Sequence, residues 1–152
     1  MKIAVFSDSH RYTDKMVRAV ETEQPDAIIH LGDVEPDAFF LEREFPDIPV
    51  YSVCGNCDLY PRSPERMMIE LGGKVLFMTH GHAYHVKFSP YSLINAAMAS
   101  RAHVLLYGHT HIPHYSCEEG LHIINPGPSG SAGCYGILTI DSSGISYVQH
   151  GR

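Results

Sequence analysis

The most constraining feature of the sequence is a series of short apolar runs, each ending in a residue whose side chain can bind a metal ion. The residues at these ends are Asp8, Asp33, Asn56, His80 and His109. Apolar runs of this length are typical of buried strands, and an open α/β sheet places its binding crevice beyond the carboxyl ends of its strands. The pattern therefore predicts an α/β protein whose strands lead to one polar site.

The stretches between the apolar runs predict three helices. The first is expected to begin after Thr13 as its cap and to stop before Pro25, and the second is expected to start near Pro36. The third is the clearest, because it begins with Ser89 as a cap and Pro90 in its first turn, followed by an apolar stripe at helical spacing.

Later apolar runs predict hairpins as well as further strands. Residues 65–80 are expected to form two strands joined at Gly72 and Gly73, and residues 135–149 a closing hairpin. Strands are also expected within residues 103–111 and 121–127. Parallel βα units at the start and hairpins later predict a mixed α/β sandwich, with two packed sheets and helices outside. Since no linker or repeat interrupts the pattern, residues 1–152 are expected to form one domain.

Composition and charge exclude several classes of function. At 152 residues, 44% of them hydrophobic, the chain can bury a core without disulfides or a structural metal. Its net charge is −6 and its Lys and Arg residues are not clustered, which disfavours general nucleic-acid binding or attachment to a membrane surface. The first apolar run is too short for a signal peptide and no run approaches a membrane span, so a cytoplasmic protein is expected.

Two of the four cysteines, Cys54 and Cys57, have the C-x-x-C spacing of redox and zinc sites. The same residues also fit an apolar strand that ends at Gly55 and Asn56, and no second close cysteine pair is present. On this interpretation Cys54 is a small buried strand residue. A thiol-based redox or metal module remains an alternative, and it predicts that replacing both cysteines with serine removes the metal.

Carboxylate, amide oxygen and imidazole ligands together suit divalent ions such as Mn²⁺, Fe²⁺, Co²⁺ or Zn²⁺ better than Ca²⁺ or Mg²⁺. A short carboxylate can bridge two such ions. Two ions about 4 Å apart can clamp a phosphate and lower the pKa of a bridging water to give hydroxide. The strand-end residues therefore indicate hydrolysis of phosphoesters.

Five motifs carry a resemblance to a known family: D-S-H at 8–10, G-D at 32–33, G-N-C-D at 55–58, H-G-H at 80–82 and G-H-T-H at 108–111. In this order they resemble the calcineurin-like metallophosphoesterases, and within them the small bacterial and archaeal phosphodiesterases related to the retromer subunit Vps29. The resemblance covers essentially the whole chain and implies a four-layer α/β/β/α sandwich, two mixed sheets with outer helices and a metal site at the strand ends.

The resemblance also implies which residues hold two divalent ions, with Mn²⁺ favoured and Ni²⁺, Co²⁺, Fe²⁺ or Zn²⁺ also suitable. Asp33 is expected to bridge the two ions. The remaining ligands would be Asp8, His10 and His111 for the first ion, and Asn56, His80 and His109 for the second.

Three further residues are candidates for catalysis beside Asp33 and Asn56. Many members of the family have histidine, thought to protonate the leaving oxygen or hold the phosphate, where this chain has Cys57. Asp58 is expected to support the site by hydrogen bonding, and His82 either orients substrate or a ligand, or is an ordinary loop residue. Elsewhere, His30 is expected to be a packed or surface residue and Asn125 to serve a turn.

The predicted function is that of a divalent-metal-dependent phosphoesterase, and more specifically a phosphodiesterase in which bridging hydroxide attacks phosphorus. Its partner would be a small phosphoester, with neither membrane nor general nucleic-acid binding, and a homo-oligomer is compatible with the sequence. The alternative is a non-catalytic interaction scaffold like Vps29. The retained ligand set favours the enzyme, since a scaffold is free to lose ligands.

Overall fold

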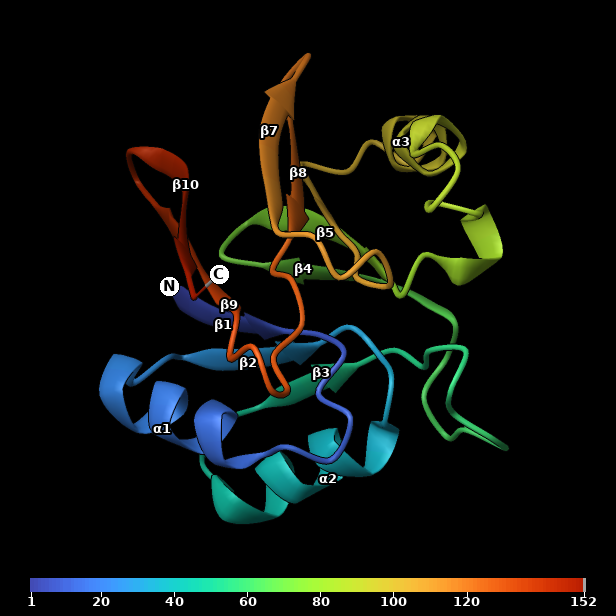
Figure 1. The fold of residues 1–152 in the computed structure, drawn as a ribbon. Coiled ribbons are helices and arrows are strands. Elements are labelled where there is room, and N and C mark those ends of the chain that lie inside the picture. Colours follow the sequence, from blue (N-terminus) through green and yellow to red (C-terminus); the bar gives the residue numbers. More distant parts are fainter. Residues whose placement is uncertain (152) are drawn as a thin grey trace.

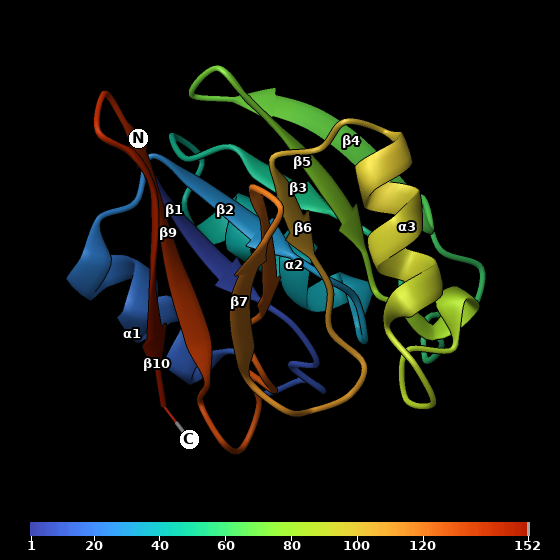
Figure 2. The ribbon, with the colours of Figure 1, turned by 90° about the horizontal axis from the view of Figure 1, so that it is seen from above.

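The structure is a computed structural model that describes residues 1–151, and two mixed sheets of five strands each form its centre. The sheets pack face to face, with helices on the outer side of each, as Figure 1 shows. Figure 2 shows the same layers from above, with α3 (Tyr91–Ala99) over the second sheet. The predicted four-layer α/β/β/α sandwich is therefore confirmed.

The first sheet has the strand order β10-β9-β1-β2-β3. Its central strands β1, β2 and β3 run parallel, whereas β9 pairs antiparallel with β1 and β10 antiparallel with β9. The strands span Lys2–Phe6 (β1), Ala27–His30 (β2), Val50–Ser52 (β3), Tyr135–Asp141 (β9) and Gly144–His150 (β10). The last two form the closing hairpin that the sequence predicts.

The second sheet has the strand order β4-β5-β6-β8-β7, in which β5, β6 and β8 run parallel. The strands span Arg66–Leu71 (β4), Lys74–Thr79 (β5), Val104–Leu106 (β6), His114–Glu118 (β7) and Leu121–Asn125 (β8). Strand β7 was not predicted, because an edge strand with exposed or half-exposed side chains shows no apolar run.

Three apolar cores separate the layers. The central core lies between the sheets and contains buried residues of both, such as Ile29 and Leu76. A second core joins α1 (Asp14–Glu23) and α2 (Glu35–Glu44) to the first sheet, and a third joins α3 to the second sheet. Each fully buried aliphatic side chain contributes about 2 kcal/mol relative to exposure, so these cores are a main source of stabilisation in the sandwich.

The helices begin close to the predicted positions, but their caps differ in detail. Thr13 is the N-cap of α1, although its side chain makes no capping hydrogen bond. The predicted start of the third helix was wrong by one residue, because Pro90 occupies the cap position and Tyr91 is the first helical residue. Ser89 Oγ accepts a hydrogen bond of 3.4 Å from the Tyr91 N–H instead.

Within residues 1–151, none of the helices has the length and apolar character needed to cross a membrane.

Candidate metal centre

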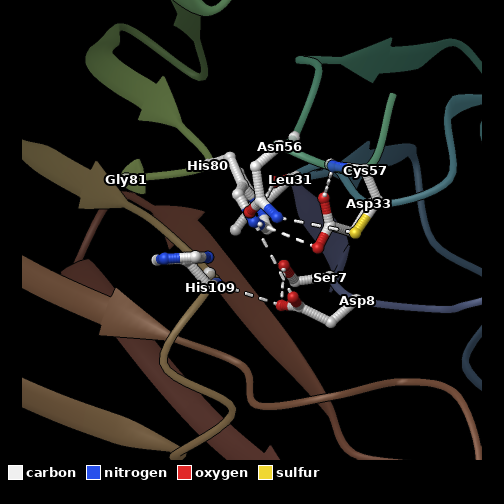
Figure 3. Close-up of polar contacts among 12 residues, drawn as sticks. Ser7, Asp8, Leu31, Asp33, Asn56, Cys57, His80, Gly81 and His109 are labelled. Carbon is white, nitrogen blue, oxygen red and sulfur yellow. Dashed lines mark hydrogen bonds and ion pairs between the residues drawn. The ribbon is translucent and has the colours of Figure 1, made fainter. Parts of the chain in front are cut away.

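The loops that follow four parallel strands meet at one edge of the sandwich. Asp8 follows β1 and Asp33 follows β2 in the first sheet, while His80 follows β5 and His109 follows β6 in the second. Figure 3 shows Asp8, Asp33 and His80 close together at this edge, with the His109 ring to one side of them. The convergence of strand ends inferred from the sequence is therefore present in the fold.

Asp8 is 1% exposed, and its two carboxylate oxygens have different surroundings. Oδ2 accepts hydrogen bonds from Ser7 Oγ at 2.6 Å and from the His109 backbone N–H at 3.1 Å. Oδ1 lies 3.0 Å from His111 Nε2, yet it has no hydrogen bond of suitable geometry among the described residues. A buried carboxylate oxygen without a hydrogen bond is costly unless a cation compensates it.

His80 is completely buried and has one ring nitrogen with a partner and one without. Nδ1 lies 2.7 Å from the Leu31 carbonyl oxygen, an acceptor, so Nδ1 carries the proton and Nε2 presents a lone pair. Nε2 lies 3.4 Å from Asp33 Oδ2 and 3.8 Å from Asp8 Oδ1, without a hydrogen bond. Metal-binding histidines typically donate their other ring N–H to a carbonyl or carboxylate, so this arrangement fits a divalent ion.

The charged groups around Asp33 also favour a bound cation. Burial alone would raise the pKa of this carboxyl, but the adjacent His80 and the hydrogen bond from the Cys57 amide lower the pKa well below its ordinary range. For His80, burial lowers the pKa, but the adjacent carboxylates of Asp33 and Asp8 outweigh it and raise the pKa. Two buried carboxylates thus favour positive charge between them.

The side chains form three overlapping groups whose ligand atoms lie within 4.8 Å of one another. The groups are Asp8 with His10 and His111, Asp8 with Asp33 and His80, and His10 with Asp33 and Cys57. The first group matches ligands expected for the first ion, whereas the second combines Asp8 of that set with the expected bridge Asp33 and with His80 of the second set. The third brings Cys57 next to expected ligands, which the sequence did not predict.

Two of the expected ligands lie at the edge of these groups. The His109 ring is outside all three, although its centroid lies 5.0 Å from that of His80. Burial, then the charges of His80 and Lys87, lower the pKa of His109 to about 4, so its imidazole is neutral. The Asn56 side chain is exposed, and its Nδ2 donates to Cys57 Sγ at 3.5 Å.

The backbone at the site is strained in a consistent way. Asp8, His10, Asp33, His109 and His111 have φ values of 52°, 48°, 54°, 66° and 59°, in the left-handed region that residues other than glycine rarely adopt. Such conformations cost about 1–3 kcal/mol each and persist mainly at functional sites, where the surrounding structure enforces them. The loops are therefore shaped for side-chain placement rather than for backbone stability.

Two glycines allow the loops to approach so closely. A Cβ on Gly108 would collide with Ser7 Oγ and lie 2.8 Å from Asp8 Oδ2, and a Cβ on Gly55 would collide with the Asp33 carboxylate. These glycines therefore make room for the two carboxylates.

Polar residues outside the expected ligand set hold the loops in place. Ser9 Oγ donates to Asp37 Oδ2 at 2.6 Å and lies 2.9 Å from Nε2 of the buried His30. Asn125 accepts from the Gly127 N–H at 2.9 Å, which confirms its turn, and also donates to the Gly108 carbonyl at 2.9 Å. Polar residues packed beside strands in this way give no distinctive sequence signal.

His82 lies next to the cluster, at the start of the short 3₁₀ helix His82–Tyr84. Its ring centroid is 5.5 Å from that of His80, and its Nδ1 is buried without a hydrogen bond among the described residues. Burial and the charge of His80 lower its pKa, which leaves a neutral ring facing the site.

Asp58 organises the backbone around Asp33 rather than reaching the cluster itself. Its carboxylate accepts hydrogen bonds from the backbone N–H groups of Asp33 at 3.2 Å, Glu35 at 2.6 Å and Gly55 at 2.7 Å. The loop that carries Asp33 and the loop that carries Asn56 are thus tied to one side chain.

We expect Asp58→Asn to weaken the site, because an amide cannot accept all three hydrogen bonds and leaves a backbone N–H without a partner. The unfolding free energy should fall by ~1–3 kcal/mol and metal affinity by ~10–100-fold. Thermal unfolding of the metal-free protein and a metal titration check both effects, with the exposed Asp47→Asn as the control. Unchanged metal affinity would show that Asp58 does not position Asp33.

The protein is an α/β sandwich with carboxylates and histidines at one edge that could hold a metal ion. A profile of the calcineurin-like phosphoesterase superfamily domain matches residues 1–143. The chain belongs to this family.

Individual relatives agree with this assignment. The chain is 33% identical to a probable metallophosphoesterase of Mycoplasma pneumoniae over 83% of the chain and 77% of the relative. It is 28% identical to a phosphodiesterase of Methanocaldococcus jannaschii over 91% of the chain and 87% of the relative. Its fold resembles that of Vps29 from Entamoeba histolytica complexed with Zn²⁺, with a TM-score of 0.84 and 18% identity over 99% of the chain and 92% of that protein.

Proposed function

We propose that residues 1–152 form one phosphodiesterase domain that depends on two divalent ions. The observation that carries the proposal is the pair of buried ligand atoms without hydrogen bonds, Asp8 Oδ1 and His80 Nε2, which face each other 3.8 Å apart within a metallophosphoesterase fold. Bound ions would supply a hydroxide nucleophile and neutralise charge on the phosphoryl group.

Each proposed ion would take its ligands from both sheets. Asp33 would be shared, because it belongs both to the group with Asp8 and His80 and to the group with His10. Asp8, His10 and His111 would complete the first set, and Asn56, His80 and His109 the second. Mn²⁺ suits this mixture of oxygen and imidazole ligands, as do Co²⁺, Ni²⁺, Fe²⁺ and Zn²⁺.

Other side chains would act on the substrate. Asn56 and His82 border the cluster and can donate hydrogen bonds to phosphoryl oxygens or orient the ligands beside them. Cys57 stands where a general acid is expected. Burial and a hydrogen bond to Asp33 raise the pKa of its thiol to about 11, far from the optimum for an acid at neutral pH.

The test is a screen of aryl phosphomonoesters, aryl phosphodiesters and cyclic nucleotides with Mn²⁺, Co²⁺ or Ni²⁺ supplied. We expect hydrolysis that requires a divalent ion, stops with a chelator, and is faster for the diester than for the monoester with the same aryl group. A monoester hydrolysed faster would overturn the phosphodiesterase proposal while leaving metal-dependent phosphoester hydrolysis intact.

Exposed apolar side chains support a second candidate, an interaction scaffold like Vps29. Leu59, Tyr60 and Phe88 are 85%, 99% and 92% exposed on loops that follow expected ligands. Apolar side chains in such positions are suited to a protein partner. Failure to hydrolyse any phosphoester in the screen would favour this candidate.

If Cys57 provides little general-acid catalysis, the rate of hydrolysis should depend steeply on the pKa of the leaving group. Aryl oxides leave with little protonation, so aryl esters should be cleaved far faster than alkyl esters. Cys57→His would introduce a group that titrates near neutrality, and well-placed acid catalysis is worth ~10²–10⁴-fold. We expect a smaller gain, favouring alkyl esters, because the new ring lacks a shaped environment.

The measurement is the rate for a series of leaving groups at fixed metal and pH, for the native chain and for Cys57→His. A shallow slope of rate against leaving-group pKa for the native chain would show that a general acid is already present. Loss of activity in Cys57→Ser with both ions bound would show that the thiol itself takes part.

A further inference from the structure

A cavity beside the candidate metal centre has no role in the proposed hydrolysis itself. It has a volume of about 300 Å³ and is lined by Val86, Lys87, Tyr107, Thr110, Ile112 and His114. Thr110 stands between His109 and His111, so the cavity opens next to two of the proposed ligands. This size accommodates one substituent of a small phosphodiester.

The polar groups in this cavity are positioned to donate hydrogen bonds. Thr110 Oγ1 already accepts from Asn125 Nδ2 at 3.0 Å and from the Ile112 N–H at 3.3 Å. Its own proton has no acceptor among the described residues, so the hydroxyl can donate to a ligand. The Lys87 ammonium adds three further donors and a positive charge. Donors and a cation together favour an anionic ligand group.

The absence of a carboxylate distinguishes this cavity from its two neighbours at the ligand loops. The cavity next to Thr79 is lined by both Arg66 and Glu65, and the cavity next to Arg11 is lined by Asp14. Among its described lining residues, the Lys87 cavity has a cation and no acid. The cavity of Lys15 and Arg18 on α1 also has cations and no acid, but none of its lining residues stands beside a proposed ligand. In a chain of net charge −6, a cavity next to the proposed ligands that has a cation and no carboxylate attracts anions.

Besides His114, the remaining lining residues are largely apolar and can contact the organic part of a ligand. Val86 and Tyr107 are buried, whereas Ile112 is 67% exposed at the mouth of the cavity. An organic group can pack on these side chains while its anionic end reaches Lys87 and Thr110.

We infer that this cavity binds a second phosphate carried by the organic substituent of a phosphodiester, as in a dinucleotide with a terminal phosphate. The inference rests on the proposed function and adds a substrate class to it. The metal centre would hold the scissile phosphate, and the Lys87 cavity would hold the terminal one. The Lys87 side chain is exposed, so its contribution should be screened by salt.

The test compares a dinucleotide that carries a terminal phosphate with the same dinucleotide without it. For the native chain at low salt, we expect kcat/KM to be about tenfold higher with the terminal phosphate, as a charged hydrogen bond provides. Lys87→Met keeps most of the side-chain volume and should bring this ratio close to one. Lys74→Met, at the amino end of β5, is the matched control and should keep the native ratio.

The result separates the two proposals. If neither dinucleotide is hydrolysed but an aryl phosphodiester is, the inference is wrong and the proposed function stands. If no phosphodiester is hydrolysed with any metal, the proposed function itself fails. The inference would also be overturned if the ratio of kcat/KM with and without the terminal phosphate were the same in the native chain and in Lys87→Met. The same holds if the native preference for the terminal phosphate did not decrease as salt is raised.

Discussion

Asp33→Asn is expected to abolish detectable phosphodiesterase activity and to reduce metal binding at both proposed positions at once. The carboxylate is 3% exposed, and it accepts the Cys57 N–H at 2.9 Å through Oδ1 while Oδ2 faces His80. An amide of the same size removes the negative charge that two cations would share. For a unit pair 4 Å apart near a protein surface, that charge is worth about 4 kcal/mol, or roughly 10³-fold in affinity.

The measurement is metal content per chain after dialysis, together with the rate on an aryl phosphodiester. Asp47→Asn makes the same chemical change at an exposed position and should keep native metal content and rate. His10→Ala should mainly affect the first ion, which separates loss of the bridge from loss of one ligand. Native metal content in Asp33→Asn with activity intact would refute the bridging role.

Gly108→Ala should also disrupt the centre, although the side chain that it adds is only a methyl group. That methyl would occupy the space of Ser7 Oγ and approach Asp8 Oδ2 to 2.8 Å, so the Asp8 carboxylate or the His109 loop must move. Overpacking in a dense region costs about 1–3 kcal/mol. A ligand displaced by ~1 Å commonly costs ~10²-fold in rate, so activity should fall more than stability predicts.

Gly120→Ala provides the control for this prediction. Gly120 has φ of 83° and open space around it, so alanine there strains the backbone without touching the site. It should lower stability by about 1 kcal/mol and leave metal affinity native. The free energy of unfolding and metal affinity should be measured for both variants. Similar metal affinity in the two would mean that close packing at Gly108 does not position Asp8.

The fold could be predicted largely because its apolar runs, although short, are buried and end sharply at polar residues. The first three strands, the hairpin at Gly72 and Gly73, and the layer order follow from those runs and from the family motifs. Strand β7 was not predicted because, at the edge of the sheet, it has no buried apolar side chains. The predicted start of α3 was wrong by one residue because Pro90 occupies the cap position. Edge strands and caps depend on neighbours that periodicity does not describe.

The candidate site was predictable only at the level of which residues lie near one another. Strand ends indicated Asp8, Asp33 and His80, and the structure brings their ligand atoms within 4.8 Å. The left-handed backbone at these loops sets where each side chain points, and no local pattern specifies it. The same reason explains why the approach of Cys57 to His10 was not foreseen. The roles of these residues remain predictions.

The most direct test of the two-ion proposal is the rate of aryl phosphodiester hydrolysis as Mn²⁺ is added stepwise to metal-free protein. We expect the rate to rise until two equivalents per chain are bound and then to remain constant, because the proposed ligand sets share Asp33 and act together. A plateau at one equivalent, or no hydrolysis after two equivalents are bound, would contradict the proposed centre.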